Sequence, residues 1–280
     1  MTIAANLSIP GAAEVNQREV DSWYQNVAHE IDDDRTPEAH RLYLRDYYRE
    51  AGLLQRYRRA YFMRHFARSF ARAAGFLLPV DGPGPIIDLG CGSGTQVLYL
   101  ALKGARVVAV DADERALAAL SWRLQRYQEL SGRQLDVKVI NADVFVHEFA
   151  QHAPIRGLYS MFAFNIMQPS EQLLDRIVPN MPCGSRIAII DGNNTSWLQT
   201  VYPPSRRQAL SPRQLRLALE KRGFTTAEHV GTVAVPPLAW YLAPALARVV
   251  DAGLCRHMFT SRSHQILAEL EQTTLTAARA

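Results

Sequence analysis

Residues 84–96 read GPIIDLGCGSGTQ, and this stretch decides the fold. A short apolar segment runs into Asp88, and Gly90, Gly92 and Gly94 follow at alternate positions. Glycine adopts positive φ and lets a backbone approach a ligand closely, because it has no Cβ. A strand, a glycine loop and a helix N-terminus together present free N–H groups to an electron-rich ligand. The stretch therefore predicts a buried strand that ends at a ligand-binding loop.

Strand and helix patterns alternate on both sides of this loop. The expected strands cover residues 85–89, 105–111, 135–143, 155–164, 185–192, 224–235 and 262–270. The expected helices between them cover residues 94–104, 114–132, 170–181 and 211–223. Such alternation is typical of a parallel sheet that is covered on both faces. We therefore expect a doubly wound, mostly parallel seven-stranded α/β sheet, with ligands bound beyond the carboxyl ends of its strands.

The first 80 residues have a different pattern. Residues 1–17 show no periodicity and are expected to form a mobile tail, whereas residues 18–76 are expected to be helical with a break near 32–37. Residues 77–85 contain three prolines and two glycines, which mark a joint. The sequence predicts an N-terminal tail and helical cap over 1–80 and a ligand-binding domain over 81–280.

Composition indicates an ordinary globular protein. The chain has 280 residues, of which 48% are hydrophobic and 21% charged, and its net charge is +4. Cys91, Cys183 and Cys255 form no CxxC pair, so we expect a reduced, cytoplasmic protein without a disulfide framework. Neither a signal peptide nor an apolar run of about 18 residues is found, so no membrane association is expected.

The spacing of the glycines excludes two common ligand loops. A phosphate-binding P-loop needs GxxxxGK[ST], and no lysine follows the glycines here. A dinucleotide fingerprint needs GxGxxG, but Thr95 occupies the sixth position. What remains is GxGxG, preceded by the acidic residue Asp88.

The segment DLGCGSG at 88–94 resembles the first motif of the class I S-adenosylmethionine (SAM)-dependent methyltransferases. The likeness extends over roughly residues 84–232. Asp111 ends the strand VVAVD, Asp143 follows the strand VKVINA, and MPCGSRIAIID resembles the family's late turn and fifth strand. Three acids at three successive strand ends, each in its expected local sequence, make the likeness more specific than a glycine loop alone.

The resemblance implies a SAM site and no metal. The carboxylate of Asp111 would bind the ribose hydroxyls and Asp143 the adenine amino group, with Val144 near the adenine and Phe162 and Ala163 near the methionine moiety. Val144, Phe162 and Ala163 are also compatible with plain core packing. Cys91 has no local histidine, so we interpret it as a small residue beside the ligand. The implied cofactor-binding residues are Asp88, Gly90, Cys91, Gly92, Gly94, Asp111, Ala112, Ala142, Asp143, Val144, Phe162 and Ala163.

The sequence departs from the family's pattern where the acceptor should bind. IRGLYSMFAF lacks the aspartate that often begins the fourth strand, and NIMQP replaces a histidine-containing turn. Catalysis requires an acceptor atom held in line with the methyl group at about 3–3.5 Å, and in some cases removal of a proton. The first candidate for a base is His29, with Tyr24 nearby, and Asn165 is expected either to orient the acceptor or to cap the next helix. Further candidates are His147, His152, His257 and the tyrosines of the N-terminal region as bases, and Arg58, Arg59 or Arg64 for the SAM carboxylate.

Three segments are expected to build the acceptor pocket. They are the helical cap, the long loop 191–210, and an apolar insertion near 236–257. The insertion carries side chains suited either to an apolar acceptor or to the packing of an extra helix. These are Leu238, Trp240, Tyr241 and Leu242.

Three functions are compatible with these features. The first is methylation of a small molecule at oxygen or nitrogen, as in specialised-metabolite biosynthesis. The second is RNA modification, since arginines recur at every fourth position at 41–49 and 64–72; acidic neighbours and the low net charge argue against a nucleic-acid partner. The third is SAM binding without methyl transfer. The sequence is also compatible with a homodimer.

Overall fold

The structure is a computed structural model of the chain. It describes residues 14–48, 55–78, 82–195, 210–233, 242–243, 245–247, 249–250, 261 and 263–271. Several expectations fall outside these residues or on side chains that are not described. They concern the N-terminal tail before residue 14, the loop 196–209, Arg58, Leu238, Trp240, Tyr241 and His257.

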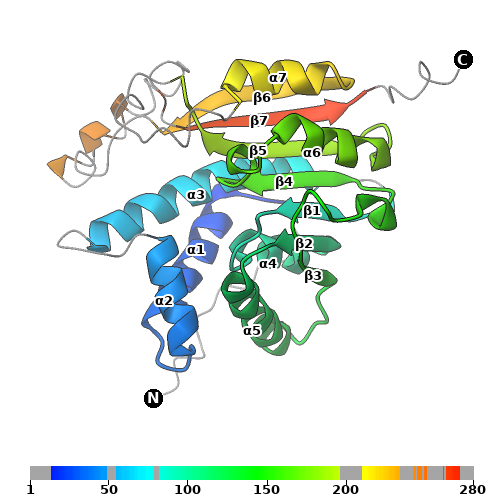
Figure 1. Cartoon of the computed structure of the whole chain (residues 1–280). Coiled ribbons are helices and arrows are strands. Elements are labelled where there is room, and N and C mark those ends of the chain that lie inside the picture. Colours follow the sequence, from blue (N-terminus) through cyan, green and yellow to red (C-terminus); the bar gives the residue numbers. More distant parts are fainter. Residues whose placement is uncertain are drawn as a thin grey trace, which may run out of the picture.

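The described residues form a seven-stranded sheet in the order β3-β2-β1-β4-β5-β7-β6 (Figure 1). Its strands are β1 Ile86–Leu89, β2 Val107–Asp111, β3 Val137–Asn141, β4 Gly157–Met161, β5 Arg186–Gly192, β6 Phe224–Val233 and β7 Ser263–Leu270. The first five pair in parallel, and β7 runs antiparallel to both β5 and β6. The expected mostly parallel doubly wound sheet of seven strands is confirmed.

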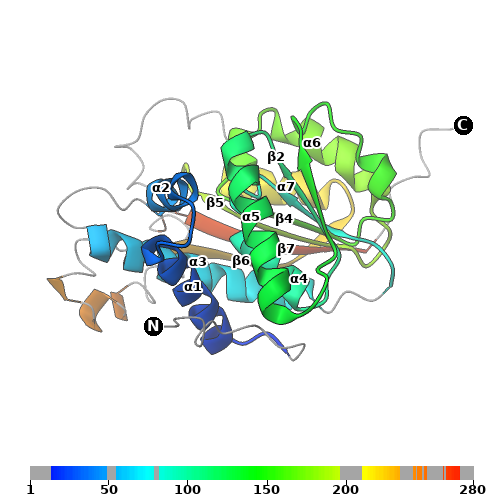
Figure 2. The same cartoon turned by 90° about the horizontal axis from the view of Figure 1, so that it is seen from below.

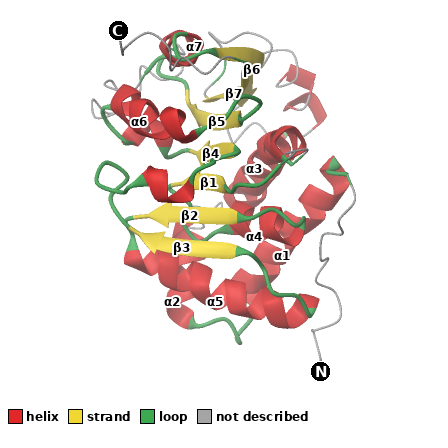
Figure 3. Cartoon of the chain, turned by 90° about the vertical axis from the view of Figure 1, so that its right-hand side faces the viewer, coloured by secondary structure: helices red, strands yellow, loops and turns green. Residues whose placement is uncertain are grey.

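Helices cover both faces of this sheet. The helices that follow the strands are α4 Thr95–Leu102, α5 Glu114–Ser131, α6 Ser170–Ile177 and α7 Pro212–Glu220. Short 3-10 turns lie at Phe149–His152, Phe164–Ile166 and Val178–Asn180. Two helix ends lie where the sequence predicts them. Gly132 ends α5 in the left-handed conformation, and Ser211 forms a capping box with Gln214 at the start of α7. Figure 3 shows α6 and α3 on opposite faces of the sheet.

Three helices precede the sheet: α1 Gln17–Asp32, α2 Glu38–Tyr47 and α3 Gln55–Leu77. Trp23 on α1 and Phe70 on α3 share one hydrophobic core with Tyr99 of α4 and Tyr159 of β4. The N-terminal helices thus cover one face of the sheet, and the expected break between the first two is present. Figures 1 and 2 place α2 and the first turns of α3 at the carboxyl ends of the parallel strands. No helix within the described ranges is long and apolar enough to span a membrane.

Candidate functional site

The glycine loop after β1 has three residues with positive φ, and the atoms around each of them differ. The φ angles of Gly90, Gly92 and Gly94 are 69°, 53° and 72°. A Cβ on Gly90 would lie 2.3 Å from the Cβ of Ala163, and one on Gly94 would lie 2.2 Å from Cδ1 of Leu120. Among the described residues, a Cβ on Gly92 would meet one atom within 4 Å, the hydroxyl oxygen of Tyr43 at 3.6 Å. Packing therefore requires glycine at 90 and 94, whereas Gly92 faces the space that a ligand could enter.

Asp111 at the end of β2 ties this loop to the neighbouring strand. Its Oδ2 accepts a hydrogen bond from the backbone N–H of Gly92 at 2.8 Å, and its Oδ1 accepts one from the N–H of Asp113 at 2.9 Å. Each carboxylate oxygen can accept a further hydrogen bond. The next residue, Ala112, is exposed.

Asp88 is a buried carboxylate that lacks a hydrogen bond to one of its oxygens within the described residues. Only 2% of the residue is exposed, and its Oδ2 has no hydrogen-bond partner among the described residues. Burial, with a smaller contribution from Asp111, raises the pKa of Asp88 well above its usual value. A cation beside this oxygen would remove both the desolvation penalty and the unmade hydrogen bond.

Cys91 packs inside the loop as a core residue. It is 5% exposed and belongs to the same hydrophobic cluster as Trp23. Burial raises the pKa of its thiol well above the usual value. A thiol held in its neutral form is a poor nucleophile, which agrees with the interpretation of Cys91 as a small packing residue.

The residues after β4 lie against the glycine loop. Phe162 is the one described non-glycine residue with positive φ, at 56°. Its ring centroid lies 5.3 Å from that of Phe66 on α3, and its N–H donates to the carbonyl of Ile190 at 2.7 Å. Ala163 is buried against Gly90. Non-glycine residues in the left-handed region store strain and cluster at functional sites, so this junction is a candidate for ligand contact.

Asn165 is held rigidly in the 3-10 turn that follows. Its N–H donates to Oδ2 of Asp191 at 2.6 Å, and its Nδ2 donates to the carbonyl of Gly192 at 3.1 Å. Its Oδ1 is buried and unpartnered within the ranges that the structure describes. Because α6 begins at Ser170 behind Pro169, Asn165 does not cap this helix. The expected capping role of Asn165 is therefore wrong, and its expected contact with the acceptor stays a prediction.

The structure does not bring His29 and Tyr24 together. His29 lies on the exposed face of α1, whereas Tyr24 is 1% exposed on the face that packs against the sheet. The hydroxyl of Tyr24 accepts a hydrogen bond from Nε2 of Gln96 at 2.8 Å. Burial raises the pKa of Tyr24 well above 10, so this phenol stays protonated at neutral pH. This arrangement disfavours the pair as a general base.

The loop after β3 carries the third expected acid. Asp143 is exposed, its Oδ1 accepts a hydrogen bond from the N–H of Phe145 at 2.8 Å, and Val144 beside it is buried. The N–H of Ala142 donates to the carbonyl of Asp111 at 3.1 Å, which sets this loop next to the end of β2. His147, farther along, forms a 3.0 Å Nε2–Nε2 contact with His152 and so already has a partner.

Sequence reasoning offered Tyr43 only as one of several N-terminal tyrosines, and it missed the buried residues behind the loop. Tyr43 lies on α2. Burial, together with the nearby carboxylates of Asp111 and Asp113, raises the pKa of its phenol well above the ordinary value. Glu30 and Arg123 form an ion pair with no significant exposure beneath the loop. These residues belong to helices whose packing partners cannot be read from periodicity, so the sequence carried no signal for their contacts.

Comparison with known proteins agrees with this geometry. Residues 86–180 match the model of a family described as a methyltransferase domain. No curated protein sequence matches the chain at a significant level.

Three solved structures share the fold. A SAM-dependent methyltransferase from Mesorhizobium loti has a TM-score of 0.52 and 18% identity, covering 72% of this chain and 97% of its own. One from Archaeoglobus fulgidus has a TM-score of 0.50 and 18% identity, covering 75% and 99%. A candidate SAM-dependent methyltransferase from Listeria monocytogenes has a TM-score of 0.53 and 14% identity, covering 74% and 100%. At these identities the likeness concerns the fold.

Proposed function

The chain is a class I SAM-dependent methyltransferase, and we propose that it methylates an oxygen or nitrogen atom of a small, largely apolar acceptor. The observation that carries this proposal is the position of the N-terminal helices. Tyr43 of α2 lies against Gly92 of the ligand loop, and Phe66 of α3 contacts Phe162 at the end of β4. Two N-terminal helices thus contribute side chains beside the ligand loop and the end of β4, and this supports a site in which the helices cover a small acceptor.

The residues around the ligand loop fit SAM. The cofactor supplies a methyl group already activated on a sulfonium ion. We assign the unpaired Oδ2 of Asp88 to the ammonium group of SAM and the open side of Gly92 to its close approach. The remaining hydrogen-bonding capacity of Asp111 is assigned to the ribose hydroxyls.

The remaining residues that the sequence predicts to contact SAM are assigned to its two ends. Ala112, Ala142, Asp143 and Val144 are assigned to the adenine side of the site. Phe162 and Ala163, with Gly90, are assigned to the methionine side. Asp143 is exposed next to the end of β2, as this assignment requires.

We assign an aromatic surface and the side chain of Asn165 to the acceptor side of the site. The rings of Tyr47 and Phe62 lie 5.8 Å and 6.0 Å from that of Phe66, which extends the aromatic surface beyond Phe162. We assign the buried Oδ1 of Asn165 to accept a hydrogen bond from the acceptor's N–H or O–H and so to orient it. His29 is exposed, so we do not assign it as a base. We propose that this site promotes methyl transfer mainly by orienting the acceptor and excluding water.

Two alternatives are less well supported. RNA modification would need a free cationic surface, but Arg41 pairs with Asp34, Arg59 with Asp32 and Arg72 with Glu228. A SAM-binding partner protein without methyl transfer needs no oriented acceptor group. The rigidly held Asn165 favours catalysis over this third function.

Calorimetric titration with SAM, its demethylated product S-adenosylhomocysteine (SAH) and NAD tests the cofactor. Binding of the first two without NAD is expected, and binding of neither would contradict the site. Transfer of a labelled methyl group to fractions of small apolar molecules, and in parallel to RNA, then tests the acceptor. Label in RNA whose yield falls steeply with salt would replace the small-molecule proposal.

A further inference from the structure

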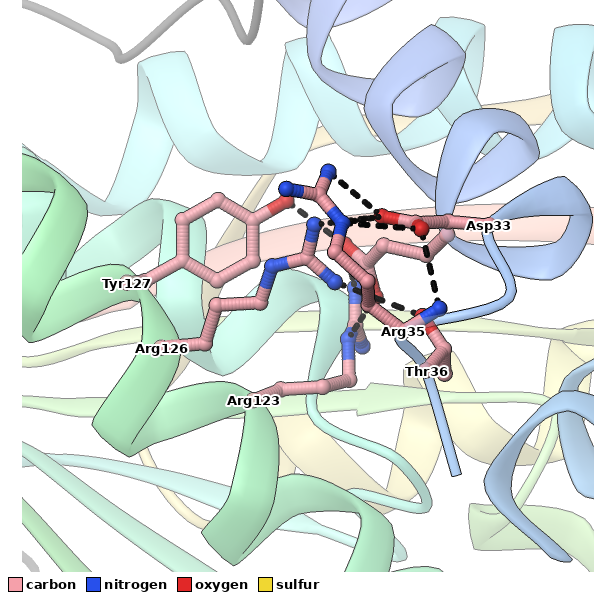
Figure 4. A network of polar contacts seen from close by, with 7 residues as sticks. Asp33, Arg35, Thr36, Arg123, Arg126 and Tyr127 are labelled. Carbon is pink, nitrogen blue, oxygen red and sulfur yellow. Dashed lines mark hydrogen bonds and ion pairs between the residues drawn. The ribbon is translucent and has the colours of Figure 1, made fainter. Parts of the chain in front are cut away.

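A buried polar network joins α1, α5 and the glycine loop. The side chains of Glu30 and Arg123 are 1% and 0% exposed. Nε and Nη2 of Arg123 donate to the two carboxylate oxygens of Glu30 at 2.7 Å and 3.3 Å. The hydroxyl of Tyr127 donates to Oε1 of Glu30 at 2.6 Å. Figure 4 shows Arg123, Arg126 and Tyr127 projecting together from α5 toward the end of α1.

The third nitrogen of Arg123 reaches the ligand loop. Nη1 donates to the carbonyl of Ser93 at 2.6 Å and to Oγ1 of Thr95 at 3.0 Å. Ser93 stands between Gly92 and Gly94, at the turn where a ligand approaches. A bidentate carboxylate fixes the plane of a guanidinium, so Glu30 determines where Nη1 points.

Helix α1 also holds the loop directly. Nε1 of Trp23 donates to the carbonyl of Thr95 at 2.9 Å, and Tyr24 contacts Gln96 one residue further on. These contacts and the Glu30–Arg123 pair lie on one face of α1, which packs on residues 93–96. The loop has permissive glycines on both sides of Ser93, so its conformation depends on such external contacts.

We propose that Glu30 and Arg123 are positioning residues that set the conformation of the SAM-binding loop and thereby make SAM affinity depend on the docked N-terminal helix. The proposal rests on the assignment of Gly92 to SAM. A buried ion pair is a poor source of stability, because apolar side chains of similar volume often replace it without loss. Its presence beneath a glycine loop is better explained by the fixed direction of Nη1. Coupling of this kind is reciprocal, so SAM should in turn stabilise the docking of α1.

The chain offers a matched control one helical turn away. Arg126 on α5 donates to Oδ2 of Asp33 at 3.0 Å and to Oγ1 of Thr36 at 3.3 Å, which joins α5 to the end of α1 by a second ion pair. These contacts do not involve the glycine loop. Glu30→Gln and Asp33→Asn each remove one charge from the same interface, but only the first changes the restraint on Ser93.

The test compares the two variants by SAH titration and by hydrogen exchange of the ligand-free proteins. Glu30→Gln is expected to raise the Kd for SAH by about tenfold or more, whereas Asp33→Asn should change it by less than about twofold. In the absence of ligand, amides 93–95 should exchange faster in Glu30→Gln alone. Equal exchange and equal Kd in the folded Glu30→Gln protein would overturn the proposal. Exchange is read without ligand, so a wild-type protein that failed to bind SAH would contradict the proposed function separately.

A second variant separates positioning from stability if Glu30→Gln does not fold. The triple change Glu30→Leu, Arg123→Met and Tyr127→Phe removes the network without leaving a buried charge unpaired. It is expected to unfold cooperatively near the wild-type midpoint and still to show weakened SAH binding and fast exchange at 93–95. Wild-type affinity and exchange in this protein would show that the network has no positioning role.

Discussion

At the scale of single residues, substitutions at the loop glycines should distinguish the effect of packing on stability from the effect of backbone exposure on ligand binding. Gly92→Ala should leave the fold intact, because its Cβ would meet no described atom nearer than the Tyr43 hydroxyl at 3.6 Å. We expect a cost of about 1–2 kcal/mol for a non-glycine residue at positive φ. Its affinity for SAH should fall more than about tenfold, since the new methyl group occupies the approach to the backbone. Thermal unfolding and calorimetry measure the two effects.

Gly94→Ala is the matched comparison. Its Cβ would overlap the side chain of Leu120 at 2.2 Å, so it should lower stability by about 1–3 kcal/mol more than Gly92→Ala does. If Gly92→Ala instead bound SAH normally, the ligand would not approach the loop at this residue.

Asp88 should make stability depend on pH in the ligand-free protein. Burial raises its pKa above the usual 3.8, so the folded state binds this proton more tightly than the unfolded state does. The resulting stability is complete below about pH 3.8 and is lost as the pH rises through the folded-state pKa. Asp88→Asn cannot ionise, so it should lose less stability than the wild type between about pH 4 and pH 8. Urea unfolding across this range measures the difference, and parallel curves for the two proteins would rule it out.

The same variant should bind SAH more weakly. An amide cannot balance the charge of the ammonium group that we assign to Oδ2 of Asp88. A gain in ligand-free stability with a loss of affinity is the combination that distinguishes a binding carboxylate from a structural one.

At the scale of elements, β7 carries an acid-sensitive group into the core. His264 is fully buried, neither ring nitrogen has a partner in the described part of the chain, and burial together with His229 lowers its pKa from 6.5 to about 3. The folded state therefore binds fewer protons, and stability present above pH 6.5 is lost as the pH falls toward 3. Between pH 6.5 and pH 4, the free energy of unfolding of His264→Phe should fall by about 3 kcal/mol less than that of the wild type, since one pKa unit corresponds to about 1.4 kcal/mol. Denaturant unfolding at several pH values measures it, and an unchanged slope would assign the acid sensitivity elsewhere.

The elements themselves were largely predictable from the sequence. Short apolar segments between capped helices predicted all seven strands, and Ser211 with Pro212 predicted the start of α7. Periodicity reports which face of a helix is buried but not which element covers it. The contacts of Tyr43 with the glycine loop and of Glu30 with Arg123, 93 residues apart, were therefore beyond reach. The positive φ of Phe162 had no local signal either, because it results from tertiary packing.

At the scale of the whole molecule, the N-terminal helices are part of the core that the sheet requires. Trp23, Val27, Ile31, Phe70 and Leu77 are each 0% exposed. Full burial of such a side chain contributes about 1.5–3 kcal/mol, so these five contribute about 8–15 kcal/mol when burial is compared with an extended unfolded chain. A domain of this kind is stable by only about 5–15 kcal/mol in total.

A protein that begins at residue 82 should therefore not fold by itself, although the turn-rich joint before it looks like a boundary. It would expose the sheet face that packs on α1 and α3 and would lose the contacts of Trp23 and Glu30 with the ligand loop. We expect dye binding to exposed apolar surface, no cooperative unfolding and no SAH binding. Adding the fragment 1–81 in trans should restore SAH binding, because the contacts it supplies are non-covalent. Cooperative unfolding and SAH binding by residues 82–280 alone would show that the sheet domain is independent and that the helices act only on the acceptor.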